Sequence, residues 1–159
     1  MNPNNQRPTV NYQVLAEFRY QIRRFLRFSE QAARSAGIEP QQYLLLLAIK
    51  GLPADRKPTI GELAERLQLQ HNSTVELINR LVERNLVQRH RDESDQRQVI
   101  VVLTAQGEEI LAQLALHHQT ELQTIGSVLL QTLETILVSS QDTQRTGGEA
   151  SRPLRQGTV

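Results

Sequence analysis

The most constraining feature of this chain is a change of hydrophobic period near its middle. Up to about residue 84, apolar residues recur at the three- and four-residue spacing of α-helices, as in Val75, Ile78 and Leu81. The runs at 86–91 and 98–103 are instead β-prone, and they flank a polar turn at 92–97. A helical region followed at once by a β-hairpin predicts a mostly α-helical, α+β fold.

Two short helices joined by a tight turn are expected immediately before the hairpin. Thr59 and Glu62 have the spacing of a capping box and open the first of them. Residues 68–70 form the turn, and the second helix runs to about residue 84 with Val82 among its inward residues. Asn85 is placed to end it in the left-handed conformation. Helix, turn, helix and hairpin in this order predict a winged helix-turn-helix over about residues 59–104.

Long helical patterns flank this region on both sides. Thr9 is expected to cap a helix over about 9–36 that ends at Gly37, and Thr104 to cap a helix that is followed by a last apolar-periodic segment at about 122–138. The expected organisation is a disordered leader at 1–8, one domain at 9–138 and a disordered tail at 139–159. Within the domain, the winged helix covers about 40–104, and long helices cover about 9–36 and 105–138. Periodicity alone leaves a plain core helix equally open for 9–36.

Composition limits the classes of protein that this chain can represent. Lys and Arg number 18 against 17 Asp and Glu, so a nucleic-acid argument must rest on where the charges lie. Hydrophobic residues make up 38%, which is lean for a lone globule and favours sharing apolar surface with a second copy. The absence of cysteine excludes disulfides, thiolate zinc sites and thiol-based sensing. No secretory signal or membrane-length apolar run is visible, which predicts a cytoplasmic protein without membrane contact.

Candidate DNA-binding residues gather at the start of the second short helix and on the hairpin. The helix start offers side chains that hydrogen-bond base edges or phosphates, and the hairpin offers arginines that suit the DNA backbone. The full set is Gln70, His71, Asn72, Ser73, Thr74, Asn79, Arg80, Arg89, Arg91, Asp95 and Arg97. Between residues 80 and 97 five arginines stand against four acids, so the count predicts no basic patch.

The loop itself suggests roles for its charged residues. Asp95 is expected to orient Arg97 through an ion pair, while Asp92 and Glu93 keep the loop soluble. A solvated loop arginine is the structural alternative for Arg97.

The hairpin and the residues after it carry two aspartates three residues apart, an arginine two residues further, and a following Leu-Thr-x-x-Gly. The residues of this pattern are Asp92, Asp95, Arg97, Leu103, Thr104 and Gly107. In this pattern the hairpin resembles the wing of the MarR family of bacterial winged helix-turn-helix transcription regulators. The resemblance covers about residues 10–138, and its helical part is less specific than its wing.

The resemblance implies a homodimer joined by the two terminal helical regions. It also implies recognition helices in successive major grooves of a pseudo-palindromic operator, with Arg97 in a minor groove and held by Asp95. Relatives often release DNA when a small aromatic or phenolic compound enters a cleft. Here that cleft would lie among the first, second and fifth helices, within reach of Tyr20, Arg23, Tyr43 and His117, although its ligand residues are unknown.

Two residues depart from the family pattern. Glu76 stands where a basic or neutral residue is common, which would weaken phosphate contact or reject certain bases. We favour a simpler interpretation of Glu76, a second capping box with Ser73. Asn85 replaces the usual glycine and suits the same backbone conformation.

The predicted function is therefore a sequence-specific DNA-binding transcription regulator. We expect a homodimeric repressor that a small ligand releases from double-stranded DNA. The alternative is a winged-helix module that binds another protein without DNA, and a third possibility is a ligand-binding protein with a vestigial wing. No catalytic motif is visible, and the adjacent His117 and His118 point about 100° apart on a helix, so we expect no enzyme, metal site or cofactor.

Overall fold

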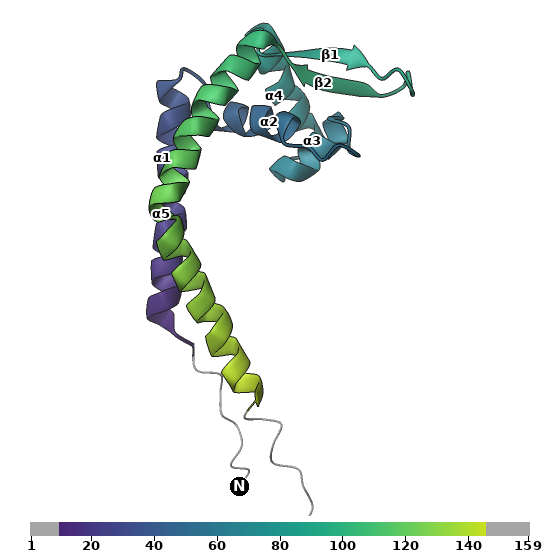
Figure 1. Cartoon of the computed structure of the whole chain (residues 1–159). Coiled ribbons are helices and arrows are strands. Elements are labelled where there is room, and N and C mark those ends of the chain that lie inside the picture. Colours follow the sequence, from purple (N-terminus) through teal and green to yellow (C-terminus); the bar gives the residue numbers. More distant parts are fainter. Residues whose placement is uncertain (1–9, 146–159) are drawn as a thin grey trace, which may run out of the picture. The chain divides into compact units, whose positions relative to one another are not determined.

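The computed structural model describes residues 10–145, which form five helices and one β-hairpin (Figure 1). This confirms the mostly α-helical fold with a winged helix-turn-helix. The elements in chain order are α1 (Tyr12–Ser35), α2 (Pro40–Lys50), α3 (Ile60–Leu67), α4 (His71–Glu83), β1 (Val87–Arg91), β2 (Val99–Leu103) and α5 (Ala105–Arg145). The expected leader at 1–8, the Thr9 cap and residues 146–159 lie outside the described part. Within that part, no helix combines the length and apolarity needed to cross a membrane.

The chain divides into two compact units. One contains residues 10–25 and 122–145 of the described chain, and the other contains residues 26–121. The boundaries fall inside α1 and α5, whereas the sequence suggested boundaries between helices. The unit at 26–121 therefore holds the winged helix together with one end of each long helix.

One hydrophobic core supports the winged-helix unit. Helix α4 contributes Leu77, Ile78 and Leu81, which are 7% exposed or less. Val82 was expected to face inward, but it is 38% exposed, because a residue adjacent to Leu81 is rotated by about 100° around the helix axis. The rest of the buried cluster comprises Ala33, Ile38, Tyr43, Leu45, Leu46, Leu63, Leu86, Val87, Val101, Leu111 and Leu114.

Local signals explain where the helices begin and end. The Thr59 hydroxyl accepts the Glu62 backbone N–H at 3.3 Å and caps α3, but the Thr59 N–H donates to the Lys57 carbonyl, so the capping box is only half formed. Helix α1 begins at Tyr12, where Asn11 accepts the Val14 N–H at 3.1 Å, and not at Thr9 as expected.

Left-handed residues end two of the helical segments where the sequence predicted them. Gly37 has φ +77° after α1, and Asn85 has φ +55° after α4. Both predictions are confirmed, because glycine and asparagine tolerate this conformation best. Gln68, at φ +55°, starts the turn of the helix-turn-helix in the same way.

The hairpin is attached to the rest of the unit through its second strand. Strands β1 and β2 pair antiparallel from Val87 opposite Leu103 to Arg91 opposite Val99. The loop before α3 joins β2, since the Val101 N–H donates to the Pro58 carbonyl at 2.9 Å. Strand β2 of the wing is therefore held by the segment that leads into the helix-turn-helix.

Helix α5 is continuous over 41 residues, from Ala105 to Arg145. The sequence suggested a helix followed by a separate segment at 122–138, but the polar residues between these patterns continue the helix without a break. The helix also extends seven residues beyond 138, into the predicted tail. Thr104 caps it as predicted by accepting the Gly107 N–H at 3.1 Å.

Candidate nucleic-acid interface

One face of α4 presents most of the predicted helix residues to solvent. His71, Asn72, Ser73, Asn79 and Arg80 are exposed, as is Gln70 at the N-cap, while the opposite face packs into the core. Exposed amide, hydroxyl and imidazole groups at a helix start suit contact with base edges.

Thr74 is the exception among these residues. Its side chain is fully buried, and its hydroxyl donates to the Gln70 carbonyl at 3.1 Å. Contrary to the sequence prediction, Thr74 does not face the solvent with its neighbours, because it lies on the core side of the helix.

The predicted capping box of Ser73 and Glu76 is wrong. Helix α4 begins at His71 with Gln70 as its N-cap, so Ser73 and Glu76 lie inside the first two turns and cannot cap them. The Glu76 carboxylate instead points outward, 71% exposed, with its Oε2 4.0 Å from Nη2 of Arg80. A pair this long and this exposed contributes little stability.

Two hairpin arginines brace the wing as well as carrying charge. Arg89 donates from Nη2 to Oδ1 of Asn79 at 2.6 Å, which joins β1 to the outer face of α4. Arg91 donates from Nη1 to the Gln96 carbonyl at 3.0 Å, across the wing loop. Each bond uses one of the five guanidinium donors, so other donors of both arginines stay accessible.

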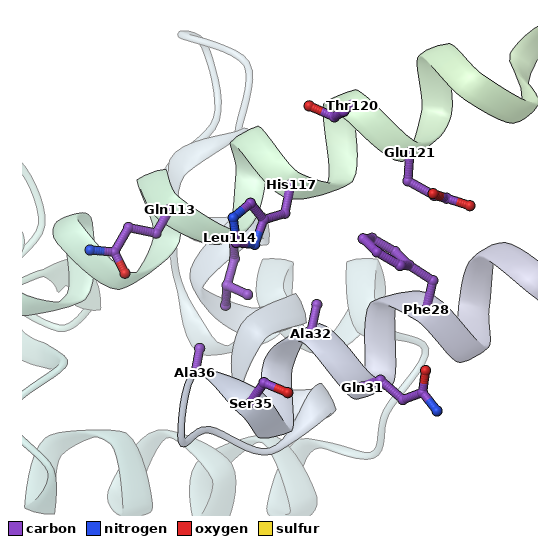
Figure 2. Close-up of a pocket in the computed structure, with 10 residues that line it drawn as sticks. All are labelled: Phe28, Gln31, Ala32, Ser35, Ala36, Gln113, Leu114, His117, Thr120 and Glu121. Carbon is purple, nitrogen blue, oxygen red and sulfur yellow. The ribbon is translucent and has the colours of Figure 1, made fainter.

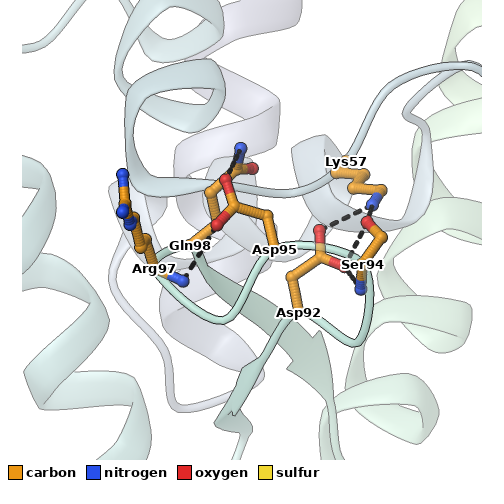
Figure 3. A network of polar contacts seen from close by, with 6 residues as sticks. All are labelled: Lys57, Asp92, Ser94, Asp95, Arg97 and Gln98. Carbon is orange, nitrogen blue, oxygen red and sulfur yellow. Dashed lines mark hydrogen bonds and ion pairs between the residues drawn. The ribbon is translucent and has the colours of Figure 1, made fainter.

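The first turn of the wing loop is built around Asp92 (Figure 3). Asp92 is 5% exposed; its Oδ2 accepts from Lys57 Nζ at 2.6 Å, and its Oδ1 accepts from the backbone N–H and the hydroxyl of Ser94. The Lys57 bond, followed by those from Ser94, lowers the pKa of Asp92 from 3.8 to about 2. Asp92 was expected to keep the loop soluble, but its carboxylate organises the loop.

The second turn is built around Asp95 and leads to Arg97. Asp95 accepts the Arg97 backbone N–H on Oδ1 at 3.0 Å and the Gln98 side-chain amide on Oδ2 at 3.1 Å (Figure 3). The sequence predicted an ion pair between Asp95 and the Arg97 side chain. In the structure, Asp95 instead accepts a hydrogen bond from the Arg97 backbone N–H. The Arg97 side chain is exposed and lies on a loop with two ordered turns.

Lys57 is a site residue that sequence reasoning missed. It stands 35 residues before Asp92, in the loop after α2, and its ammonium also donates to the Ser94 hydroxyl at 2.6 Å. A lysine in a polar loop carries no local signal for such a role. The pairing of Pro58 and Thr59 with β2 brings it beside the wing.

Together, a helix-turn-helix with a polar outer face and an anchored, arginine-bearing hairpin define a winged helix-turn-helix protein. Residues 36–98 match the model of the MarR family. The HTH-type transcriptional regulator SarZ of Staphylococcus aureus is 36% identical over 73 residues, which are 46% of this chain and 47% of SarZ. The chain thus spans about half the length of the curated relatives it matches.

Solved structures of two other regulators share the fold. A mutant of Staphylococcus aureus MepR bound to an oligodeoxyribonucleotide aligns with a TM-score of 0.59 and 19% identity, over 87% of this chain and 99% of that chain. A structure of Bordetella bronchiseptica BpsR, whose DNA binding is regulated by 6-hydroxynicotinic acid, aligns with a TM-score of 0.58 and 18% identity, over 83% and 98%. At these identities the likeness concerns the fold.

Proposed function

We propose that this protein is a sequence-specific DNA-binding transcription regulator, with α4 in the major groove and Arg97 of the wing on an adjacent minor groove. The observation that carries the proposal is the wing loop. Two turns anchored by Asp92 and Asp95 hold the loop and the Arg97 backbone, and the Arg97 side chain is exposed. Cationic side chains that neutralise phosphates or enter a narrow minor groove supply affinity. The family match over residues 36–98 and the DNA-bound state of MepR support this function.

Replacing Arg97 by alanine tests the wing. Arg97→Ala should weaken binding to the selected operator, and the log–log dependence of affinity on salt should become shallower by about 1 per arginine lost. The far-UV circular dichroism should stay unchanged, because the loop is exposed. Arg34→Ala is the matched control, since it removes the same charge from an exposed position on α1. Equal affinity and equal salt slope for the Arg97 variant and the original protein would refute the wing assignment.

The same titration separates DNA binding from the competing function. The near balance of charges favours a winged-helix module that binds another protein. Such a module would bind duplex DNA with neither sequence preference nor a steep salt dependence.

We further propose that the regulator is a homodimer joined by the unit at 10–25 and 122–145. Large apolar side chains are exposed on this unit, and Leu130 and Leu137 are 62% and 56% exposed. An apolar surface of this kind is stabilised by covering it with a second copy. Sedimentation should give twice the chain mass of 18.1 kDa. The dimer should weaken in Leu130→Glu but not in Gln123→Glu, which adds the same charge at an exposed polar position.

The third part of the proposal is that the protein is a repressor and that a small ligand releases it from its operator. A cavity of about 670 Å³ lies in the winged-helix unit between the end of α1 and the start of α5, a size that suits small molecules (Figure 2). Phe28, Ala32 and Leu114 supply apolar walls, and His117 and Glu121 supply polar groups. The regulation of BpsR by 6-hydroxynicotinic acid supports an aromatic ligand.

Only one of the four residues expected near the cleft lines this cavity. His117 does so, whereas Tyr43 is buried and stacked on His118 with ring centroids 4.5 Å apart. Tyr20 and Arg23 border a different hollow, which lies in the other unit.

The cavity is tested with 6-hydroxynicotinic acid as the probe. The compound should lower the operator affinity of the original protein, and Ala32→Phe, which fills the cavity, should abolish this response while leaving DNA binding intact. An undiminished response in Ala32→Phe would place ligand binding elsewhere.

A further inference from the structure

We infer that Glu76 is a specificity-determining residue that reads a cytosine in the major groove. This inference rests on the proposed function. It starts from the position of Glu76 on α4, where Asn72, Glu76, Asn79 and Glu83 follow one another at spacings of four, three and four residues. All four are exposed, and this stripe lies opposite the buried Leu77, Ile78 and Leu81.

Glu76 differs from the other residues of this stripe in its position and its contacts. Asn79 already accepts a hydrogen bond from Arg89 at 2.6 Å, and Glu83 lies in the last turn of the helix. Glu76 lies between Asn72 and Asn79, in the second turn of the helix, and neither caps the helix nor packs into the core. Its nearest charged partner is Arg80, at 4.0 Å between two largely exposed side chains, so the carboxylate stays open to solvent and to DNA.

A carboxylate on the groove face has few favourable partners in DNA. Phosphates repel it, and guanine and thymine present acceptors to the major groove. Adenine offers an N6 donor, but its neighbouring N7 is an acceptor that disfavours an anion. Cytosine offers the N4 donor without an adjacent acceptor, and it is the base that glutamate accepts from.

Arg80 complements this choice. Its guanidinium lies one turn further along the helix, beside the carboxylate, and guanine O6 and N7 are its preferred base acceptors. The two side chains together match a G·C-containing step, in which Glu76 accepts from cytosine and Arg80 donates to guanine. Glu76 thus restricts which DNA sequences bind tightly, because a base other than cytosine at that position leaves the carboxylate charge unpaired.

The experiment is selection of bound duplexes from a randomised pool with four proteins: the original chain, Glu76→Gln, Glu76→Ala and Glu83→Gln. The original chain should enrich a C·G pair at one position of each half-site, with about 5- to 100-fold discrimination. Glu76→Gln should change that position to A·T, because an amide pairs with adenine N6 and N7. Glu76→Ala should lose the preference there and bind non-cognate DNA more tightly. Glu83→Gln removes an equal charge and should leave the preference unchanged.

Two outcomes would overturn the inference, and they are distinguishable. If the original chain selects a clear operator but Glu76→Gln selects the same one, Glu76 does not read a base and the proposed function stands. If the original chain enriches no sequence, both the proposed function and this inference are wrong.

Discussion

Replacing Gly107 by alanine tests how the wing is joined to α5. Gly107 lies in the first turn of α5, and a Cβ built on it would lie 2.0 Å from the carbonyl oxygen of Leu86, directly before β1. Ordinary contact begins at 3.4 Å, so the helix or the strand must move by about 1.4 Å (3.4 minus 2.0). The Leu86 carbonyl belongs to the backbone, so it cannot relieve the contact by rotating away as a flexible side chain would. The same oxygen accepts the Thr104 N–H at 3.1 Å, and the movement strains that bond.

These contacts set the expected size of the effect. Overpacking costs about 1–3 kcal/mol, and weakening the Thr104 bond costs about 1 kcal/mol more. The better helix propensity of alanine offsets at most about 1 kcal/mol. Gly107→Ala should therefore lower the free energy of unfolding by about 1–3 kcal/mol and the Tm by about 2–4 °C for each kcal/mol.

Urea unfolding followed by far-UV circular dichroism measures this change, with all variants at one protein concentration because a dimer links stability to concentration. Gly61→Ala is the matched control. It lies in α3 with open space around the added Cβ, so it should be neutral or stabilising by up to about 1 kcal/mol. An unfolding midpoint for Gly107→Ala that equals or exceeds that of the original protein would refute the steric argument.

Three further predictions concern the wing and the helix termini. Lys57→Met should speed hydrogen exchange at the Ser94 amide, because Asp92 loses the ammonium that holds it in place, and unchanged exchange would contradict this tether. Because its folded pKa is lowered from 3.8 to about 2, Asp92 contributes stability above pH 3.8 that is lost as the pH falls through about 2. The advantage of the original protein over Asp92→Asn in urea unfolding should thus shrink between pH 5 and pH 2, and a constant difference would argue against the ion pair. Thr59→Ala should lower the unfolding free energy by about 1 kcal/mol through loss of the α3 cap, as measured by the same method, and no loss would exclude the cap.

Local sequence signals determined most of the fold. The change of hydrophobic period separated the helices from the hairpin, and the caps at Thr59 and Thr104 and the left-handed Gly37 and Asn85 lie where their residue types predicted. These signals act within three or four residues of the chain, so the sequence displays them directly. The pattern of Asp95 and Arg97 likewise located the wing loop.

The tertiary structure decided which side chains the site can use. Thr74 is buried and Glu76 exposed, because α4 begins at His71 and its packing sets which face turns outward. Asp92 accepts hydrogen bonds from nearby Ser94, but its partner on Oδ2 is Lys57, which lies 35 residues away in the chain. The sequence predicted a wing with an arginine near its tip, and the structure added the contacts that hold it, because such contacts depend on segments that only folding brings together.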